Sequence, residues 1–403
     1  MSKKKMSGFP TQEQALADFF ESWKPTPEQT ATELVSLDDS IDRILSEDII
    51  SKYNLPLVRS SGMDGIAVRS SDFADGIPNT AEWVKGKDYV RADTGDDFPD
   101  EFDSVIAIED VTELEGGGLS LDLDEPVTPG CNVNPSGSRI RSGETVLKAG
   151  IRIRPTDITV LCMAGATMVP VRRKPKIAFI PTGSELVTSG TEPLRGQNID
   201  TNSLMVKHML IEYGAEPVVF PIIRDNPAEL ERALDTAVAS CDCVVINGGS
   251  AVGSEDFNVR LMEKRGKVVH HYISAVPGRP MMMAVIDGKP IVDLPGPTLA
   301  AFFGTTWCLK KIVSRFLGTT PRENQKVRAL AKNGTGAPKN FAKLTRVQLT
   351  KSESGYEAEF IPRKAGLADC MASNAMHVSP VGESGVEAGS VVEVELLRSE
   401  SEI

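Results

Sequence analysis

The sequence predicts a multidomain α/β protein in which a doubly wound α/β domain is combined with two β-rich regions and a small helical region. Between residues 176 and 317, short apolar runs alternate with helical patterns, which is typical of a parallel sheet covered by helices on both faces. Residues 53–150 and 319–403 instead contain short β-branched runs separated by turn residues. A chain of 403 residues also exceeds the usual size of one core, so roughly two to four domains are expected.

Composition and charge narrow the classes of function. Apolar residues make up 40% of the chain and charged residues 25%, as in ordinary globular proteins. The net charge of −12 disfavours broad nucleic-acid binding, which needs a basic face. No apolar stretch is long enough to cross a bilayer, so we expect no membrane partner and a cytoplasmic protein. The cysteines and histidines lack the spacing of a zinc site. Most residues of basic clusters such as 172–176 are interpreted as solvated loop charges, and the alternative that one or two of them meet an anionic small molecule stays open.

Three helices are expected outside the α/β region. Apolar positions recur at helical spacing in residues 12–23, and a second run, residues 36–49, begins with serine and aspartate residues that suit a helix start. A third helix is predicted after Ile151, because Pro155 suits the first turn of a helix and Gly165 suits its end.

Two strand–loop elements point to phosphate chemistry. In residues 244–257, VVINGGSAVGSEDF, a buried strand leads into a glycine-rich turn and then into an acidic pair that opens a helix. The N–H groups of such a turn can bind an anion, and the acidic pair can hold a divalent metal beside it. Residues 176–181 form a second strand of this kind, followed by Thr-Gly-Ser-Glu. Both turns would lie at the carboxyl edge of one parallel sheet, where ligands bind. By themselves, these loops also fit a generic nucleotide-binding α/β protein, although that interpretation leaves the β-rich regions unexplained.

Eight segments, in one order along nearly the whole chain, carry a more specific resemblance. They are SSGMDGIAV (60–68), TGDDFPDEFDSVIAIED (94–110), RSGETVLKAG (141–150), PTGSELV (181–187), GQNIDTNS (196–203), NGGSAVGSEDF (247–257), PGRP (277–280) and LPGP (294–297). In these segments the chain resembles the molybdopterin molybdenumtransferase (MoeA/gephyrin E-domain) family.

This resemblance implies an elongated, four-domain subunit that works as a homodimer, with the cleft between the α/β domain of one subunit and the inserted domain of the other. It implies insertion of molybdate into the dithiolene of adenylylated molybdopterin, with release of AMP and with Mg²⁺ as the divalent cation. The expected domains are an α/β molybdopterin-binding domain (1–25 plus 174–318), a helical linking domain (26–48 plus 150–173), an inserted β-rich domain (49–149) and a C-terminal β-barrel domain (319–403).

The resemblance and the residue types together give a set of catalytic candidates: Asp64, Thr94, Glu185, Asp256 and Arg279. Asp64, Glu185 and Asp256 are the expected Mg²⁺ ligands, because hard cations prefer carboxylate oxygen. Thr94 and Arg279 are expected to hold the oxyanion. Simpler structural roles stay open: an Asx-turn at Asp64, helix capping by the other two carboxylates, a tight turn at Thr94 and a surface ion pair at Arg279.

A second set of residues is expected to hold the pterin or the nucleotide. Most of these residues follow the ends of predicted strands: Gly183, Ser184, Gly248, Gly249, Ser250, Gly253, Pro295 and Gly296. Three more, Asp200, Asn202 and Ser203, lie in the polar loop that opens a helix, where Asn202 or Ser203 could also act as the cap.

The chain departs from the family pattern at several motif positions. Thr145 follows Gly-Glu where the family usually has an aspartate, Val276 replaces a lysine, and Pro297 replaces the asparagine of Leu-Pro-Gly-Asn-Pro. Losing a cation beside an oxyanion site typically costs about 10²- to 10³-fold in rate. The alternatives are therefore a divergent paralogue that inserts tungstate, an oxyanion of nearly the same size and charge, or a non-catalytic scaffold that binds the pterin.

Overall fold

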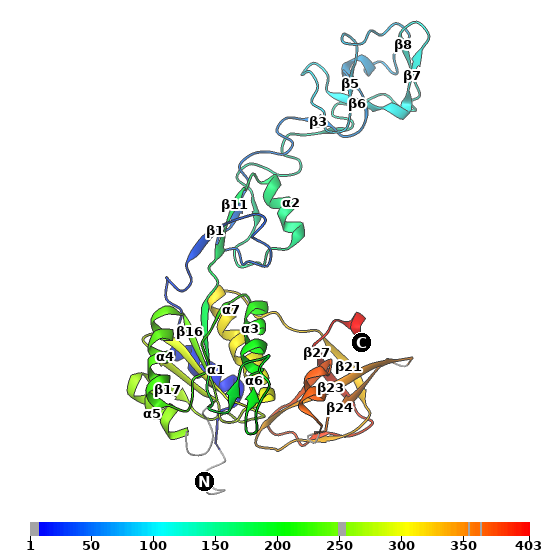
Figure 1. The fold of residues 1–403 in the computed structure, drawn as a ribbon. Helices are drawn as coiled ribbons and strands as arrows, with labels where there is room; N and C mark the ends of the chain where they lie inside the picture. The colour runs from blue at the N-terminus through cyan, green and yellow to red at the C-terminus, as the bar shows by residue number, and fades with distance from the viewer. Residues whose placement is uncertain (1–7, 249–254, 354, 363–364) are drawn as a thin grey trace. The chain divides into compact units, whose positions relative to one another are not determined.

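The computed structural model describes residues 8–248, 255–353, 355–362 and 365–403 (Figure 1). Its contacts divide the chain into two units: Met1–Thr32 with Arg172–Ile403 forms unit 1, and Glu33–Val171 forms unit 2. Within the described ranges, no helix is both long enough and apolar enough to span a membrane.

Unit 1 contains a six-stranded sheet in the order β15-β12-β16-β20-β19-β17. The first four strands are parallel, and β19 runs antiparallel to both of its neighbours. The strands are β12 (Lys176–Pro181), β15 (Glu216–Val219), β16 (Cys243–Asn247), β17 (Lys267–His270), β19 (Met282–Ile286) and β20 (Lys289–Leu294). The sequence analysis did not identify β17 and β19. The first is only four residues long and the second is rich in methionine, which is not a typical strand residue.

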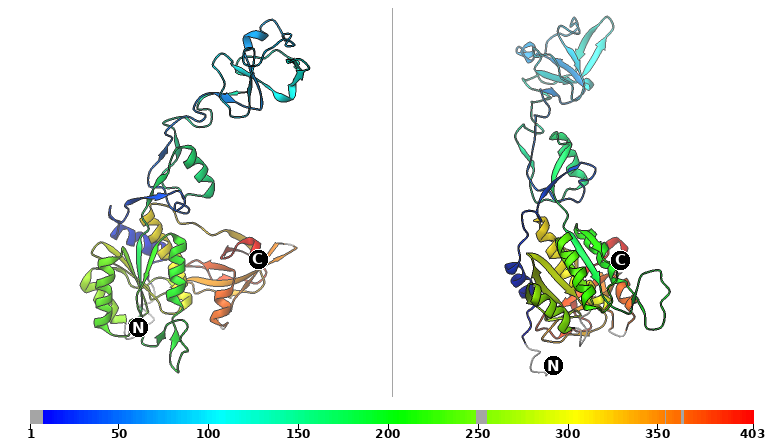
Figure 2. Two further views of the ribbon diagram at one scale, coloured as in Figure 1. Left: turned by 45° about the horizontal axis from the view of Figure 1, so that its top comes forward. Right: turned by 60° about the vertical axis from the view of Figure 1, so that its left-hand side comes forward.

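Helices cover both faces of this sheet, as Figures 1 and 2 show. On one side lie α4 and α5, and on the other lie α3 and α7. The helices of unit 1 are α1 (Gln12–Ser22), α3 (Asn202–Tyr213), α4 (Pro227–Ser240), α5 (Glu255–Arg265), α6 (Thr298–Gly304) and α7 (Lys310–Leu317). A π-helical segment, Thr305–Leu309, joins α6 to α7, so the helical structure continues from Thr298 to Leu317. The doubly wound α/β prediction is confirmed.

The carboxy-terminal region closes into a five-stranded barrel, because β25 pairs with both β27 and β23. Its strands are β21 (Lys326–Ala331), β23 (Ala342–Ser352), β24 (Gly355–Phe360), β25 (Ala375–Ser379) and β27 (Val391–Leu396). Val347, Phe360 and Val394 are buried in its core. Shorter elements complete the region: β18 (Ala275–Val276), β22 (Thr335–Gly336), β26 (Gly385–Val386) and α8 (Leu367–Ala372). The predicted barrel is confirmed.

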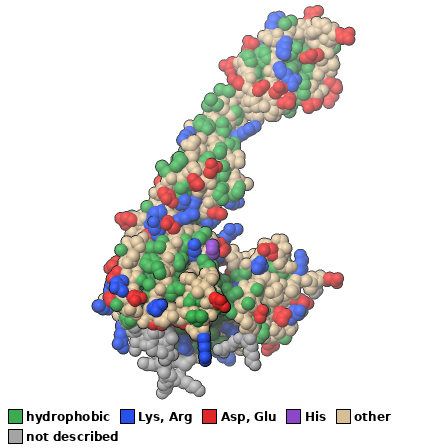
Figure 3. Space-filling model, viewed as in Figure 1, with side chains coloured by type: hydrophobic (Ala, Val, Ile, Leu, Met, Phe, Trp, Pro, Cys, Tyr) green, Lys and Arg blue, Asp and Glu red, His purple; other side chains and the backbone are tan. Residues whose placement is uncertain are grey.

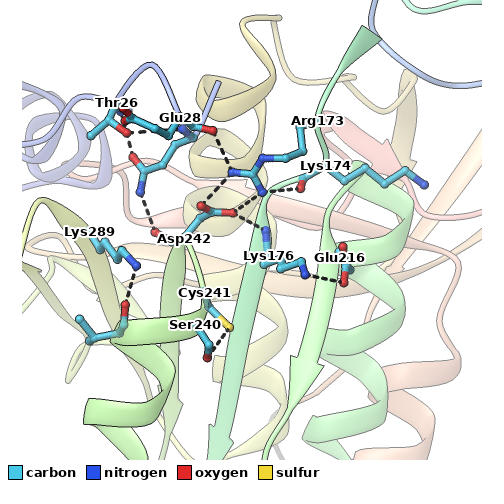
Figure 4. Close-up of polar contacts among 12 residues, drawn as sticks. Thr26, Glu28, Arg173, Lys174, Lys176, Glu216, Ser240, Cys241, Asp242 and Lys289 are labelled. Carbon is cyan, nitrogen blue, oxygen red and sulfur yellow. Dashed lines mark hydrogen bonds and ion pairs between the residues drawn. The ribbon is translucent and has the colours of Figure 1, made fainter. Parts of the chain in front are cut away.

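Asp242, which directly precedes β16, binds the basic segment that enters β12 (Figure 4). Arg173 Nη1 and Nη2 donate to the two carboxylate oxygens of Asp242 at 2.9 and 3.0 Å, and the backbone N–H of Lys176 donates to Asp242 Oδ2 at 2.7 Å. Bidentate guanidinium–carboxylate pairs fix geometry as well as charge. The interpretation of residues 172–176 as solvated charges is therefore wrong for Arg173.

Unit 2 contains a small region around α2 (Pro155–Met163) and an inserted β-rich region. In the first region, Leu45, Ile153 and Leu161 form a buried cluster. It holds the pairs β1 (Thr32–Ser36) with β11 (Met168–Arg172) and β2 (Ile49–Ile50) with β10 (Thr145–Leu147). The inserted region holds the sheet β5 (Val90–Ala92), β4 (Gly65–Val68), β6 (Ser104–Ala107) and the pairs β3 (Ser60–Ser61) with β9 (Val133–Asn134) and β7 (Val111–Leu114) with β8 (Gly118–Leu121).

The helix predicted for residues 36–49 is wrong, since this stretch runs from the end of β1 through turns and isolated bridges to the start of β2. Ser36 Oγ donates to Asp39 Oδ2 at 2.7 Å and closes a local turn. Asp42 has a positive φ of 62°, which a helix does not accommodate. Leu45 is fully buried and bridges to Val171 of β11. Most apolar residues of this stretch are buried as their pattern suggests, but the bridge to β11 and the side-chain hydrogen bonds of the turns determine the backbone conformation.

Gly65 is required by the close approach of two strands. A Cβ at this position would lie 1.9 Å from the carbonyl oxygen of Ile106 in β6. We expect Gly65→Ala to lower the free energy of unfolding of unit 2 by about 3 kcal/mol, because neither backbone can move without breaking the sheet. Thermal unfolding of the full chain measures this. Gly336→Ala, where the added Cβ meets open space, is the control and should change the transition little.

Candidate functional site

Asn247, at the end of β16, is the centre of the carboxyl edge of the sheet. Its Nδ2 donates to the carbonyl oxygens of Leu294 (3.3 Å) and Pro295 (2.9 Å). Asn202 Nδ2 in turn donates to Asn247 Oδ1 at 2.9 Å and to the Gly296 carbonyl at 2.7 Å. The structure thus brings together three predicted binding residues, Asn202, Pro295 and Gly296, through an asparagine that the sequence analysis did not single out. The sequence feature that could have identified Asn247 is an amide side chain at the end of a wholly buried strand.

Asn202 keeps one acceptor without a partner. The side chain is 7% exposed, and its Oδ1 is buried and accepts no hydrogen bond from any described residue. A buried acceptor of this kind costs free energy until a donor reaches it. An N–H group of a bound ligand would satisfy it.

Gly248 begins the glycine-rich turn after β16. Its N–H donates to the Leu294 carbonyl at 3.1 Å, its φ is +104°, and a Cβ there would lie 2.5 Å from the carbonyl oxygen of Thr182. Only glycine allows this approach. The predicted residues Gly249, Ser250 and Gly253 lie outside the described residues. Asp256 lies in the first turn of α5, and its side chain is likewise outside what the structure describes.

The loop after β12 is tied to Asp225, which the sequence analysis also missed. Ser184 N donates to Asp225 Oδ2 at 3.1 Å, and Asp225 N donates back to Ser184 Oγ at 3.0 Å. Gly183 N donates to the Ile223 carbonyl at 3.0 Å. The N–H groups of Gly183, Ser184 and Gly248 are therefore already paired within the protein, and an anion at this edge must be held by other groups. The sequence feature that could have identified Asp225 is its position between β15, the strand that pairs with β12, and Asn226, the N-cap residue of α4.

Glu185 carries an exposed carboxylate at this edge. A Cβ on Gly183 would lie 2.8 Å from Glu185 Oε2, so the carboxylate folds over the glycine. No described residue forms a hydrogen bond or an ion pair with this carboxylate. The expected helix-capping role is not seen, because the residues after Glu185 form the short strand β13 (Leu186–Val187), which pairs with β14 (Asn198–Ile199).

Asp200 organises the start of α3. Its Oδ1 accepts from the N–H of Ser203 at 3.0 Å, and its Oδ2 accepts a short hydrogen bond from Ser203 Oγ. The capping bond is thus made by Asp200 rather than by Asn202 or Ser203, which leaves the Asn202 amide for the contacts with Asn247 and Gly296.

Asp293 lies one residue before the end of β20 and is only 3% exposed. Asn258 Nδ2 donates to Asp293 Oδ2 at 3.1 Å. Burial raises the pKa of Asp293 to about 7, and the bond from Asn258 opposes this only in part.

The raised pKa of Asp293 predicts how stability depends on pH. The native chain takes up a proton that the unfolded chain, with an aspartate pKa of about 3.9, has already lost. The effect of Asp293 is therefore that the free energy of unfolding is highest below about pH 4 and decreases as the pH rises to about 7. Asp293→Asn should abolish this slope and should stabilise the chain at pH 8 by up to about 4 kcal/mol. Denaturant unfolding of both proteins at pH 5 and pH 8 measures the difference, and equal slopes would contradict the assignment.

In unit 2, the structure brings Asp64 and Thr94 together. Asp64 Oδ1 accepts from the N–H and from Oγ1 of Thr94, both at 2.7 Å. These bonds, with a smaller contribution from the charge of Arg91, hold the pKa of the Asp64 carboxyl below its usual value. The contacts come from Thr94 and not from an Asx-turn of Asp64 itself. Acidic side chains are frequent on the visible face of the inserted region in Figure 3.

Thr94→Val should raise the pKa of Asp64 toward its ordinary value, because valine keeps the N–H donor and removes the hydroxyl donor. In the wild type, the stabilisation from this lowered pKa is present above the unfolded pKa of about 3.9 and is lost as the pH falls through the native value. An NMR titration of the Asp64 carboxyl carbon measures the shift. Arg91→Gln, which removes only the weaker charge effect, should shift the pKa less.

Arg279 lies between β18 and β19 and is half-buried. Its carbonyl oxygen accepts from the N–H groups of Ile273 at 3.0 Å and Met281 at 2.9 Å, which fixes the loop backbone. Its guanidinium forms no ion pair with a described residue, so the surface ion-pair alternative is not what the structure shows.

The carboxyl edge of the sheet offers oxygen donors that suit a hard cation, namely the carboxylates of Glu185 and Asp225. Across the described ranges, however, no group of three or more His, Cys, Asp or Glu side chains is arranged to hold a metal. Mg²⁺ typically binds one or two carboxylates and takes its other ligands from water and substrate phosphates. The donor set therefore fits a magnesium ion that binds together with a phosphorylated substrate.

Comparisons with known proteins match most of the chain. The model of the MoeA N-terminal region (domain I and II) matches residues 11–165, and that of a probable molybdopterin binding domain matches residues 178–315. The crystal structure of a molybdopterin biosynthesis MoeA protein from Pyrococcus horikosii aligns with a TM-score of 0.82 and 28% identity, over 97% of this chain and 100% of that one.

Curated relatives agree. The chain is 28% identical to the molybdopterin molybdenumtransferase of Bacillus subtilis over 394 residues, which are 93% of this chain and 91% of the relative. It is 32% identical to the molybdopterin molybdenumtransferase of Haemophilus influenzae over 304 residues, which are 72% of this chain and 74% of the relative. On these matches and on the fold, the chain belongs to the MoeA family of molybdopterin molybdenumtransferases.

Proposed function

We propose that this chain is a molybdopterin molybdenumtransferase, which inserts molybdate into adenylylated molybdopterin and releases AMP. The observation that carries the proposal is the buried Oδ1 of Asn202 at the carboxyl edge of the sheet, which accepts no hydrogen bond from the part of the chain that the structure describes. Aromatic heterocycles such as adenine and pterin present N–H donors that such an acceptor can bind. The amide of Asn202 cannot simply be reversed, because its Nδ2 already donates to two oxygens.

The edge then divides into a buried part for the ring system and an exposed part for the phosphates. Asn202, Asn247 and the Pro295–Gly296 carbonyls form the buried part, while Glu185 supplies an exposed carboxylate. A bound Mg²⁺ would supply positive charge against the phosphoanhydride as it breaks. Glu185 and Asp256 are the proposed residues to hold it, and on the family resemblance Asp64 would be supplied by the inserted domain of the partner subunit.

Two residues receive refined roles in this proposal. Arg279 is the proposed oxyanion-binding group, since its guanidinium is not engaged by a described residue and a planar fork suits an oxyanion. Thr94 already donates its N–H and its hydroxyl to Asp64, so its proposed role is to orient that carboxylate.

The direct test is AMP release by the purified chain supplied with adenylylated molybdopterin, MgCl₂ and sodium molybdate, followed by chromatography. Release should require both the metal and the oxyanion. Parallel reactions with tungstate decide between the two oxyanions. Pterin binding without AMP release under any of these conditions would replace the proposal with that of a non-catalytic scaffold.

The family resemblance also supports a homodimer, a cytoplasmic location and the four-domain division of the sequence given above. Light scattering of the purified chain should give twice the mass of one chain, and cell fractionation should recover the protein with cytoplasmic enzymes. Limited proteolysis should cut near the boundaries at residues 48, 149 and 318.

A further inference from the structure

Asp293 is an acidic side chain in a layer that is otherwise apolar. Its register partners are Ile246 in β16 and Met282 in β19, and all three side chains are buried. Asp293 Oδ1 is buried and has no hydrogen-bond partner among the described residues. Within the described ranges, the one side-chain hydrogen bond to this carboxyl group comes from Asn258, which is 4% exposed.

This contact joins the end of β20 to the first turn of α5. Residues 249–254 lie between β16 and α5, and the described residues on both sides of them are fastened to β20. On one side, Gly248 N donates to the carbonyl oxygen of Leu294 at 3.1 Å. On the other, Asn258 donates to Asp293 at 3.1 Å. Two consecutive residues of one central strand therefore anchor both ends of the connection.

Stability alone does not account for this buried pair. Placing a carboxyl group in an apolar layer is costly, and replacing such a polar pair by apolar side chains of similar size is often neutral or stabilising. What a hydrogen bond adds over an apolar contact is a fixed direction and distance between two backbones. The pair lies directly beside the predicted site, because Asn258 follows Asp256 by two residues and Asp293 precedes Pro295 by two.

We propose that Asp293 is a positioning residue of this site, which acts through Asn258 to fix the start of α5, and with it Glu255 and Asp256, against the end of β20. Glu255 and Asp256 are both in α5, so the orientation of this helix sets where their backbones begin. The proposal rests on the proposed function for its metal-dependent readout, whereas its conformational readout does not.

The conformational test is hydrogen–deuterium exchange of the metal-free full chain. In Asp293→Leu, amides of residues 257–262 should exchange about 10-fold faster than in the wild type, because the anchor of the first turn is lost. Asp293→Asn keeps an acceptor for Asn258 and should retain most of the protection. Ile291→Val, a substitution of a buried residue two positions earlier in the same strand, is the control for a general loss of stability of about 1 kcal/mol. It should leave these amides as they are in the wild type.

Metal binding is measured in two ways. Titration of the chain with Mn²⁺ alone, followed by electron paramagnetic resonance, gives the dissociation constant for Mn²⁺, and AMP release gives the KM for Mg²⁺. Both constants should rise about 10- to 100-fold in Asp293→Leu and in the double variant Asp293→Leu/Asn258→Leu, as is usual when a supporting contact behind a metal ligand is lost. Asp293→Asn should restore most of the affinity.

Two results would overturn the proposal. One is a double variant that is at least as stable as the wild type and has unchanged Mn²⁺ affinity and unchanged exchange. The other is an Asp293→Leu effect that Ile291→Val reproduces. A wild-type chain that releases no AMP refutes the proposed function instead, and the exchange and Mn²⁺ measurements still decide the role of Asp293.

Discussion

Glu185→Gln is expected to lower kcat/KM for AMP release by about 10²- to 10³-fold, which is the usual cost of removing one charged group from a site that stabilises developing charge. Glu185 is exposed at the end of β12, and no described residue binds its carboxylate. Glutamine has the same shape, so the substitution removes charge without removing a contact that holds the fold. The rate should fall while the unfolding transition stays in place.

The matched control is Glu192→Gln, which removes the same charge from an exposed residue further along the same connection. It should leave the rate unchanged within about twofold. If Glu185→Gln were as active as this control at limiting Mg²⁺, Glu185 would not be a metal ligand.

Asp64→Asn is expected to reduce kcat/KM by about 10²-fold, through loss of charge alone. Asparagine keeps an oxygen that can accept both hydrogen bonds from Thr94, so the local geometry of the turn is preserved. An aspartate of ordinary or lowered pKa is ionised at neutral pH, so the variant loses a whole negative charge. AMP release at saturating and at limiting Mg²⁺ separates a loss of metal binding from a loss of turnover.

For this variant, Asp75→Asn provides the control, since Asp75 is an exposed aspartate of the same unit. Its rate should match that of the wild type. An Asp64→Asn chain with wild-type kinetics would leave the Asp64–Thr94 contact as a purely structural feature of unit 2.

Hydrophobic patterning predicted much of the fold because many elements are locally consistent. Strands such as β12 and β16 are apolar except for one end residue each, Lys176 and Asn247, and helices such as α4 carry both a cap and an amphipathic pattern. The helix predicted for residues 36–49 was wrong because the spacing of apolar residues alone does not show that Leu45 bridges to a strand more than a hundred residues away.

The candidate site was predictable where its residues follow strands in short motifs, and less so where it depends on side chains that meet across the sheet. Gly248 was recognisable because it directly follows β16, and Glu185 because it lies in the short loop after β12. Asn247, Asp225 and Asp293 were not singled out, since each gains its meaning from a partner on another element. The aspartate inside the apolar run of β20 could have been recognised from the sequence, because burying a carboxyl group without a partner costs free energy.

Under the proposed function, the carboxylates of Asp64 and Glu185 serve one metal-dependent step. Kinetics of AMP release by Asp64→Asn, Glu185→Gln and the double variant, at one limiting Mg²⁺ concentration, test this most directly. Residues that act as a unit are strongly non-additive, so the double variant should be no more than about threefold slower than the slower single variant. If the two losses multiply instead, Asp64 and Glu185 act independently and the account is contradicted.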